Sequence, residues 1–155
     1  MNIFNVEIND NIIDLIKTMP VVEKGVFNLD LKKPPPKDNL DIACNAKYIE
    51  LPQQLKNATH ESIHNAIHTN IKYSNCIAYP PNGGMDWHTN GDAPGIRIYA
   101  SWSETGDSGM IWYKDNRIII DYDTKGLNIR QFTTPCWHGV WSKCYRYSIG
   151  FRLFS

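Results

Sequence analysis

The chain has 155 residues and a mass of 17.8 kDa, which is enough for one domain and too little for two independent hydrophobic cores. Its hydrophobic fraction of 42% excludes an intrinsically disordered chain. Lysine plus arginine and aspartate plus glutamate each total 16, and this neutral balance argues against a surface that is uniformly basic for binding nucleic acid.

The sequence shows no pattern typical of a signal peptide or of a membrane-spanning segment. Residues 1–17 contain no basic stretch followed by an apolar core, and no apolar run approaches the ~20 residues that cross a membrane. The four cysteines show no CxxC spacing and are expected to stay reduced. We therefore expect a cytoplasmic protein with no membrane partner, and the sequence does not set its oligomeric state.

Residues 1–72 are expected to hold supporting elements. A first helix is predicted before Pro20, and weak alternation predicts a strand over residues 21–31. An exposed polyproline turn is expected at residues 32–37. Isoleucines recur every four residues near the end of 52–70, which predicts a second helix there.

The remaining part of the chain, residues 73–155, predicts short β-strands rich in Ile, Tyr, Trp, Phe and Val, separated by turn signals. The eight expected strands span residues 73–79, 84–88, 96–103, 109–114, 117–122, 127–133, 138–142 and 144–154. Strands without intervening helices are typical of a sandwich, barrel or jelly roll. We expect a mainly β (α+β) fold in one domain, 1–155, with N-terminal helices covering the outer face of one sheet.

Three histidines, His60, His64 and His68, are spaced so that they share one face of the second predicted helix. The run His60-Glu61-Ser62-Ile63-His64 matches HExxH, the zinc-protease motif. The third histidine does not fit the extended form of that motif. A helix face that flanks the sheet is therefore the favoured interpretation, and a zinc protease is the alternative.

The other two histidines lie at strand ends. His88 ends the second predicted strand and His138 opens the seventh, so they can meet at one mouth of a jelly roll. Non-haem Fe(II) oxygenases bind iron through two imidazoles and one carboxylate on one face of the metal. In the last strand, Arg146 and Ser148 point to the same side and can hold one carboxylate together. Arg152 falls on that side too, and a buried pair of arginines is costly unless an anion meets it.

These positions resemble the core of the Fe(II)/2-oxoglutarate-dependent dioxygenase superfamily, whose fold is a double-stranded β-helix of about eight strands. The resemblance covers residues 73–155 and is carried by His88-x-Asn90, His138, Arg146-x-Ser148 and Arg152. The ending of the chain is similar to AlkB-like members, and Tyr79 stands where AlkB-like and prolyl-hydroxylase-like members place a tyrosine. The compact length resembles short phage and marine bacterial oxygenases.

The resemblance implies a role for each of these residues. His88, Asn90 and His138 would be the catalytic residues that bind Fe(II). Arg146 and Ser148 would bind the distal carboxylate of the co-substrate 2-oxoglutarate. By the same likeness, Arg152 and Tyr79 would assist in binding the co-substrate. The implied activity is that of a dioxygenase that hydroxylates or oxidatively demethylates its substrate.

Asn90 departs from the pattern, because the superfamily places an aspartate or glutamate there. The asparagine is a neutral ligand, or it leaves a gap filled by water or another anion, as in halogenases of the superfamily. Alternatively Asp86 or Asp92 takes the place of the carboxylate, or deamidation of Asn90-Gly91 creates an aspartate. In a last alternative the site is degenerate and the protein binds without catalysing.

The substrate is expected to be a peptide or a small molecule. Neutral charge disfavours nucleic acid. Arg97 can pair with a substrate carboxylate or, equally, with Asp86 or Asp92, and Tyr99 and Trp102 are candidates for the pocket lining. The alternative function is a non-catalytic binding or assembly module on the same fold.

Overall fold

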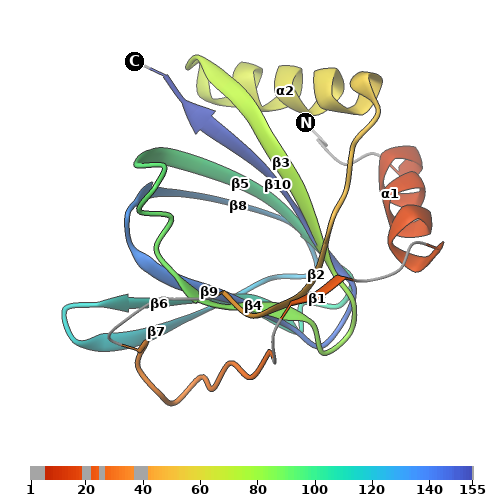
Figure 1. Cartoon of the computed structure of the whole chain (residues 1–155). Coiled ribbons are helices and arrows are strands. Elements are labelled where there is room, and N and C mark those ends of the chain that lie inside the picture. Colours follow the sequence, from red (N-terminus) through yellow and green to blue (C-terminus); the bar gives the residue numbers. More distant parts are fainter. Residues whose placement is uncertain (1–5, 19–21, 25–26, 37–41, 155) are drawn as a thin grey trace.

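The computed structural model describes residues 6–18, 22–24, 27–36 and 42–154 (Figure 1). The elements in these ranges are α1 (Val6–Thr18), β1 (Val22–Lys24), β2 (Cys44–Tyr48), α2 (Gln53–Ile67), β3 (Ile71–Tyr79), β4 (Gly84–His88), β5 (Gly95–Ser103), β6 (Ser108–Lys114), β7 (Arg117–Tyr122), β8 (Gly126–Thr134), β9 (Trp137–Ser142) and β10 (Arg146–Leu153). Neither described helix is long and apolar enough to cross a membrane.

The strands pair antiparallel along the path β7-β6-β9-β4-β2-β3-β10-β5-β8, and β1 adds to β2. The path curls so that β3, β10, β5 and β8 face β4, β9, β6 and β7 across an interior (Figure 1). On one side β2 joins the two sheets, because it pairs with both β3 and β4. On the other side β7 and β8 are the two ends of the path. This is a double-stranded β-helix, and the predicted fold class is confirmed.

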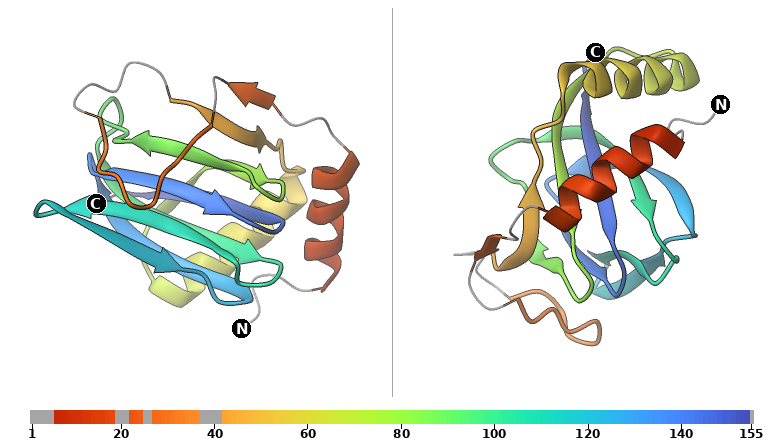
Figure 2. Two further views of the ribbon diagram at one scale, coloured as in Figure 1. Left: turned by 90° about the horizontal axis from the view of Figure 1, so that it is seen from below. Right: turned by 90° about the vertical axis from the view of Figure 1, so that its right-hand side faces the viewer.

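All eight strands predicted in the second half form, each with ends within two residues of the expected ones. The first half differs more. The segment 21–31 contributes only the three paired residues of β1 to the described structure, while β2 was not predicted. Residues 27–36 instead run without regular structure across the outer face of the sheet that holds β4 and β9 (Figure 2).

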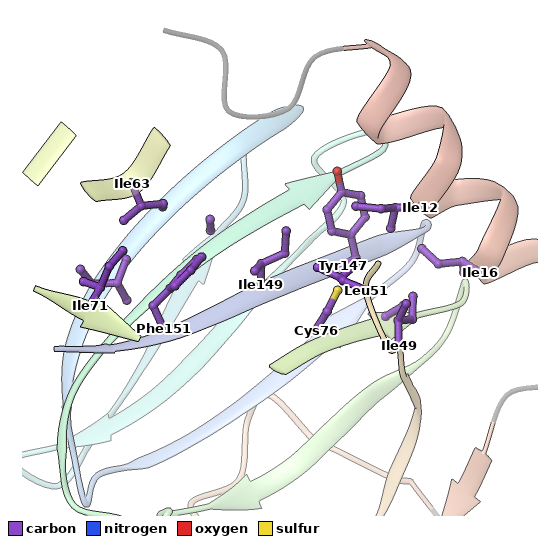
Figure 3. Close-up of a cluster of buried hydrophobic side chains, with 13 residues drawn as sticks. Ile12, Ile16, Ile49, Leu51, Ile63, Ile71, Cys76, Tyr147, Ile149 and Phe151 are labelled. Carbon is purple, nitrogen blue, oxygen red and sulfur yellow. The ribbon is translucent and has the colours of Figure 1, made fainter. Parts of the chain in front are cut away.

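The two helices cover the outer face of the sheet that holds β3, β10 and β5, as expected. Ile12 of α1 and Ile63 of α2 are buried against Tyr147, Ile149 and Phe151, alternate residues of β10 (Figure 3). Each such burial contributes about 1.5–3 kcal/mol. Because side chains alternate along a strand, the residues between these point the other way, into the space between the sheets.

The other sheet is covered by the irregular segment rather than by a helix. Two glycines make room for it. A Cβ at Gly84 would collide with the Phe27 ring and the Val140 carbonyl oxygen, and a Cβ at Gly139 would lie 3.3 Å from Leu29. The close approach of this segment therefore depends on residues without side chains at these two positions.

Candidate functional site

A cavity of about 80 Å³ lies between the two sheets. Six of the seven predicted site residues line it: Tyr79, His88, Asn90, His138, Arg146 and Ser148. They come from β3, β4, β9, β10 and the loop after β4, so the fold brings together residues that are up to 69 positions apart in the chain (148 minus 79).

His88 and His138 lie side by side at one end of this cavity. They are directly paired across β4 and β9, and their ring centroids are 4.0 Å apart. The pairing of β4 with β9 is irregular between Met85 and His88. Because of this irregularity, the side chains of Met85 and His88 both point into the cavity. Each imidazole Nδ1 lies against a backbone carbonyl two residues earlier, at 2.8 Å from Asp86 and 2.7 Å from Cys136. With Nδ1–H as the donor, each Nε2 keeps its lone pair for another partner.

Both imidazoles are held in their neutral form. Burial lowers the pKa of His88. Burial, reinforced by His88 and Arg97, lowers the pKa of His138 to about 3. A metal ligand must be a neutral imidazole, so the pair is ready to bind a cation without first losing a proton.

Asn90 lies beside this pair. Its Nδ2 is 3.4 Å from Nε2 of His138, and its side chain shares a hydrogen bond with Tyr99. The backbone of Asn90 is left-handed, with φ of 55°, a conformation that asparagine and aspartate adopt more readily than other residues with side chains. An ion bound at Nε2 of His138 would therefore lie within reach of the Asn90 amide.

No carboxylate takes the place of the missing ligand in the described part of the chain. Asp86 accepts a backbone hydrogen bond from Asn28, and Asp92 is exposed; neither lines the cavity. The described residues hold no group of three histidine, cysteine, aspartate or glutamate side chains arranged around a metal position. The histidine pair and Asn90 are thus the metal-ligand candidates that the cavity offers.

Arg146 and Ser148 lie farther along the cavity. Arg146 is fully buried, and its Nε donates to Oδ2 of Asp123 at 2.7 Å. Its guanidinium lies over the Tyr79 ring, 5.8 Å from the ring centroid. The Nη2 group of Arg146 is buried without a partner among the described residues. Ser148 accepts a hydrogen bond from the Ser101 hydroxyl at 2.9 Å.

Asp123 is a buried partner of the candidate site that the sequence analysis did not single out. It accepts hydrogen bonds from Arg146 and Arg130, both at 2.7 Å, and from Ser108 at 2.6 Å. Burial alone would raise the pKa of Asp123, but Arg146, Ser108 and Arg130 together hold it below its ordinary value. Asp123 is therefore an internal counter-ion for the buried Arg146. With no partner in the described part of the chain, the Nη2 group of Arg146 remains free to bind a ligand.

Arg97, rather than Arg152, is the second buried arginine of the cavity. Arg152 is exposed at the end of β10 and lies outside the cavity lining, so the expected buried arginine pair on β10 does not form. Its direct neighbour across β5, Arg97, is 6% exposed and lines the cavity. Nη2 of Arg97 donates to the Ala93 carbonyl at 2.8 Å, and Arg97 forms no ion pair with Asp86 or Asp92.

Aromatic side chains surround the His138 end of the cavity. Tyr99 lines the cavity as expected, whereas Trp102 stacks on Tyr147 on the outer face, at 5.5 Å between centroids. Phe132 lies 5.3 Å from the His138 ring and Trp112 lies 5.7 Å from it. Both also line a groove of about 490 Å³. The sequence offered one signal for this wall, the alternation that places Phe132 on the inner side of its strand.

The helix histidines form a structural contact. Helix α2 ends at Ile67, and His68 has a left-handed φ of 54°, so the expected common face of three histidines is wrong. Nε2 of His60 bonds the Ile71 carbonyl at 2.8 Å, and Nδ1 of His64 bonds the Thr69 carbonyl at 3.0 Å. These bonds tie the helix to the start of β3, in agreement with the favoured interpretation of a sheet-flanking face.

Neither a protein-family model nor a curated protein matches the chain. Solved structures do. The chain is similar to a prolyl hydroxylase from Trichoplax adhaerens, solved with a peptide fragment of the hypoxia inducible factor oxygen degradation domain (TM-score 0.59, 13% identity, 99% of this chain and 81% of that one). It is also similar to an oxidoreductase of the 2OG-Fe(II) oxygenase family from Burkholderia pseudomallei (TM-score 0.54, 11% identity, 97% and 79%).

These likenesses concern the fold. The chain shares its double-stranded β-helix with these two structures over nearly its whole length. At 11–13% identity the comparison speaks for the fold, and the chemistry of the site has to be argued from the residues themselves.

Proposed function

We propose that this protein is an Fe(II)/2-oxoglutarate-dependent oxygenase that hydroxylates a peptidyl or small-molecule substrate. One observation carries the proposal. The paired imidazoles of His88 and His138 and the unpartnered Nη2 of Arg146 belong to the walls of the same cavity.

The metal side of the cavity fits Fe(II). The imidazoles of His88 and His138 are neutral, are fixed through Nδ1, and keep Nε2 for a cation. The Asn90 amide, whose Nδ2 faces Nε2 of His138, would have to turn over to offer its oxygen as a neutral third ligand. Since no charge comes from position 90, metal affinity would rest more heavily on the two histidines than in a site with a carboxylate.

The co-substrate side fits a carboxylate. Nη2 of Arg146 is a buried donor without a partner among the described residues, and such a group costs free energy until an acceptor meets it. Ser148 lines the cavity beside it, and Tyr79 packs under the guanidinium. These three residues would hold the distal carboxylate of 2-oxoglutarate. A contribution from Arg152 stays a prediction, because its side chain is exposed.

When bound, Fe(II) and 2-oxoglutarate would supply a four-electron reduction of O2: two electrons would come from the conversion of 2-oxoglutarate to succinate and CO2, and two from a substrate C–H bond. One oxygen atom would enter succinate and the other the hydroxylated substrate. The chain's own part is to orient the reactants and exclude water. Buried Tyr79, Met85 and Val140 would serve the second purpose, since they line the cavity with apolar surface.

A second candidate function is a non-catalytic binding module. It is favoured by the neutral Asn90, because the described cavity lining contains two arginines and no aspartate or glutamate. Such a module would bind 2-oxoglutarate or another carboxylate at Arg146 without a firmly held iron.

An anaerobic titration with Fe(II) and 2-oxoglutarate tests the proposal through the visible charge-transfer band of the iron–keto acid pair. We expect the band in the native protein, its loss in His138→Ala and Arg146→Gln, and its retention in the matched controls His64→Ala and Arg117→Gln. A band that appears only in Asn90→Asp would support the binding module. No band in either protein would overturn the oxygenase.

A further inference from the structure

We infer that the substrate is a carboxylic acid with an apolar body, whose carboxylate meets Arg97 and whose body lies against Phe132 and Trp112. The inference rests on the proposed function, because it places this substrate beside the histidine pair of the oxygenase site. It narrows the substrate from peptides and small molecules in general to one chemical class.

Arg97 is a buried cation without a counter-ion in the described structure. It is 6% exposed, takes part in none of the ion pairs there, and donates one hydrogen bond, to the Ala93 carbonyl. A guanidinium stays charged at any ordinary pH and has five N–H donors. Burying such a charge is costly unless an anion meets it. Arg97 also lines the cavity, so an anion there can reach it.

In the proposed complex, the positive charge of Arg97 is the one that no negative charge balances. The two positive charges of Fe(II) balance the two negative charges of 2-oxoglutarate. Arg146 is balanced by the buried Asp123, and His88, His138 and Asn90 are neutral. A carboxylate at position 90 would have cancelled the charge of Arg97 within the protein. With an asparagine there, that negative charge is missing from the described cavity lining, and a carboxylate on the substrate would supply it.

The surroundings of Arg97 describe the rest of that substrate. Phe132 is the direct partner of Arg97 across β5 and β8. The Phe132 ring packs edge-on against Tyr99 at 4.8 Å and Trp112 at 4.9 Å, and it lies 5.3 Å from His138. A molecule anchored by its carboxylate at Arg97 would thus lay its C–H bonds on an aromatic wall next to the metal ligands.

The groove that Phe132 and Trp112 line has room for such a body. Its volume is about 490 Å³, within the ~300–1,000 Å³ typical of small-molecule sites, and Ile119 and Trp137 add to its apolar lining. Lys114 is the one charged residue of the described lining, and it is exposed. An apolar chain or ring fits this composition better than a polar one.

Pairs of acids and their amides test the assignment, because they differ in charge and hardly in shape. The probes are 3-phenylpropanoate with 3-phenylpropanamide, and hexanoate with hexanamide. Each is titrated anaerobically into protein loaded with Fe(II) and 2-oxoglutarate, and binding is followed by calorimetry. We expect each acid to bind about tenfold to hundredfold more tightly than its amide, the range for a hydrogen bond to a charged group.

Variants locate the effect. Arg97→Gln should bind acid and amide alike, Arg97→Lys should keep part of the preference, and the exposed Arg117→Gln should keep all of it. Equal binding of acid and amide by the native protein, a preference that survives in Arg97→Gln, or no binding of any probe at millimolar concentration would overturn the inference. So would tighter binding of a peptide with both ends blocked than of any acid.

The charge-transfer band distinguishes failure of the substrate assignment from failure of the oxygenase. If Arg97→Gln loses the band, Arg97 binds the co-substrate and the substrate assignment is overturned while the oxygenase stands. If the native protein shows no band, the oxygenase fails, and the acid–amide comparison on the metal-free protein still decides whether Arg97 binds a carboxylate.

Discussion

Replacing Asp123 by asparagine should be among the most destabilising single changes in the interior. The Asp123 side chain is fully buried and shared by Arg146, which is 1% exposed, and Arg130, which is 10% exposed. Asparagine keeps the shape and removes the charge, so both guanidiniums lose their common counter-ion. Removing one partner of a buried ion pair costs about 3–5 kcal/mol. For a chain of this size that lowers the melting temperature by roughly 6–20 °C, at about 2–4 °C per kcal/mol.

The assay is thermal and urea unfolding followed by circular dichroism, at neutral and acid pH. The folded-state pKa values of Asp121 and Asp123 both lie below their ordinary values: Arg130 bonds Asp121, and three donors outweigh the burial of Asp123. Their contribution to stability is therefore present above pH ~4 and is lost as the pH falls through the folded-state pKa. Asp123→Asn should show a smaller acid loss than the native protein.

Asp121→Asn is the matched control. Asp121 is 42% exposed and bonds the same Arg130, so its loss should cost about 1 kcal/mol or less. A free energy of unfolding for Asp123→Asn within about 1 kcal/mol of the native value at neutral pH, or equal losses in the two variants, would refute the role of Asp123 as a shared buried counter-ion.

Three further predictions concern packing and metal binding. Gly84→Ala should lower the free energy of unfolding by about 1–3 kcal/mol in urea, since its Cβ would collide with Phe27 and Val140, and unchanged stability would contradict the packing of residues 27–36. Ile63→Ala should cost about 2–5 kcal/mol by the same assay, because Ile63 fixes α2 on the sheet; a loss below 1 kcal/mol would contradict that. His138→Ala should abolish binding of Fe(II) in equilibrium dialysis and His64→Ala should not, whereas the reverse would revive the helix site.

The second half of the fold was predictable because its information is local. Alternating apolar residues define each strand, and turn residues end it, so β4 and β7 begin and end where expected. The first half depends on contacts that are distant in sequence. β2 has only one aromatic and no β-branched residue, and it forms because β3 and β4 both offer it an edge. Residues 27–36 lie flat on a sheet that local patterning cannot foresee.

The residues of the candidate site also differ in how far the sequence predicts them. His88, His138, Arg146 and Ser148 could be placed in one cavity from strand position and side-chain alternation, because those two rules fix where a side chain points. Asp123 could not, since it lies in the connection after β7 and its two arginine partners lie 7 and 23 residues further on.

Arg97 and Arg152 show that side-chain alternation along a strand does not predict burial. They share a face and are cross-strand neighbours, yet one is buried and the other exposed. Alternation gives the face of a strand and says nothing about depth along it.

Asn90→Asp links the two proposals, because one added charge should act on both in opposite directions. The backbone at residue 90 is left-handed, a conformation in which aspartate, like asparagine, is enriched. A carboxylate beside His138 should raise Fe(II) affinity by about tenfold or more, since a charged partner contributes about 1.5–3 kcal/mol. The same carboxylate should balance Arg97 and so weaken the preference for acid over amide.

Asn116→Asp is the matched control for that experiment. It adds the same charge at an equally left-handed residue, φ of 60°, in an exposed turn, and should change neither quantity. If Asn90→Asp binds Fe(II) no more tightly than the native protein, position 90 does not act on the metal. If iron affinity rises and the acid preference stays, the charge at position 90 does not reach Arg97, and the charge balance that predicts an acidic substrate is wrong.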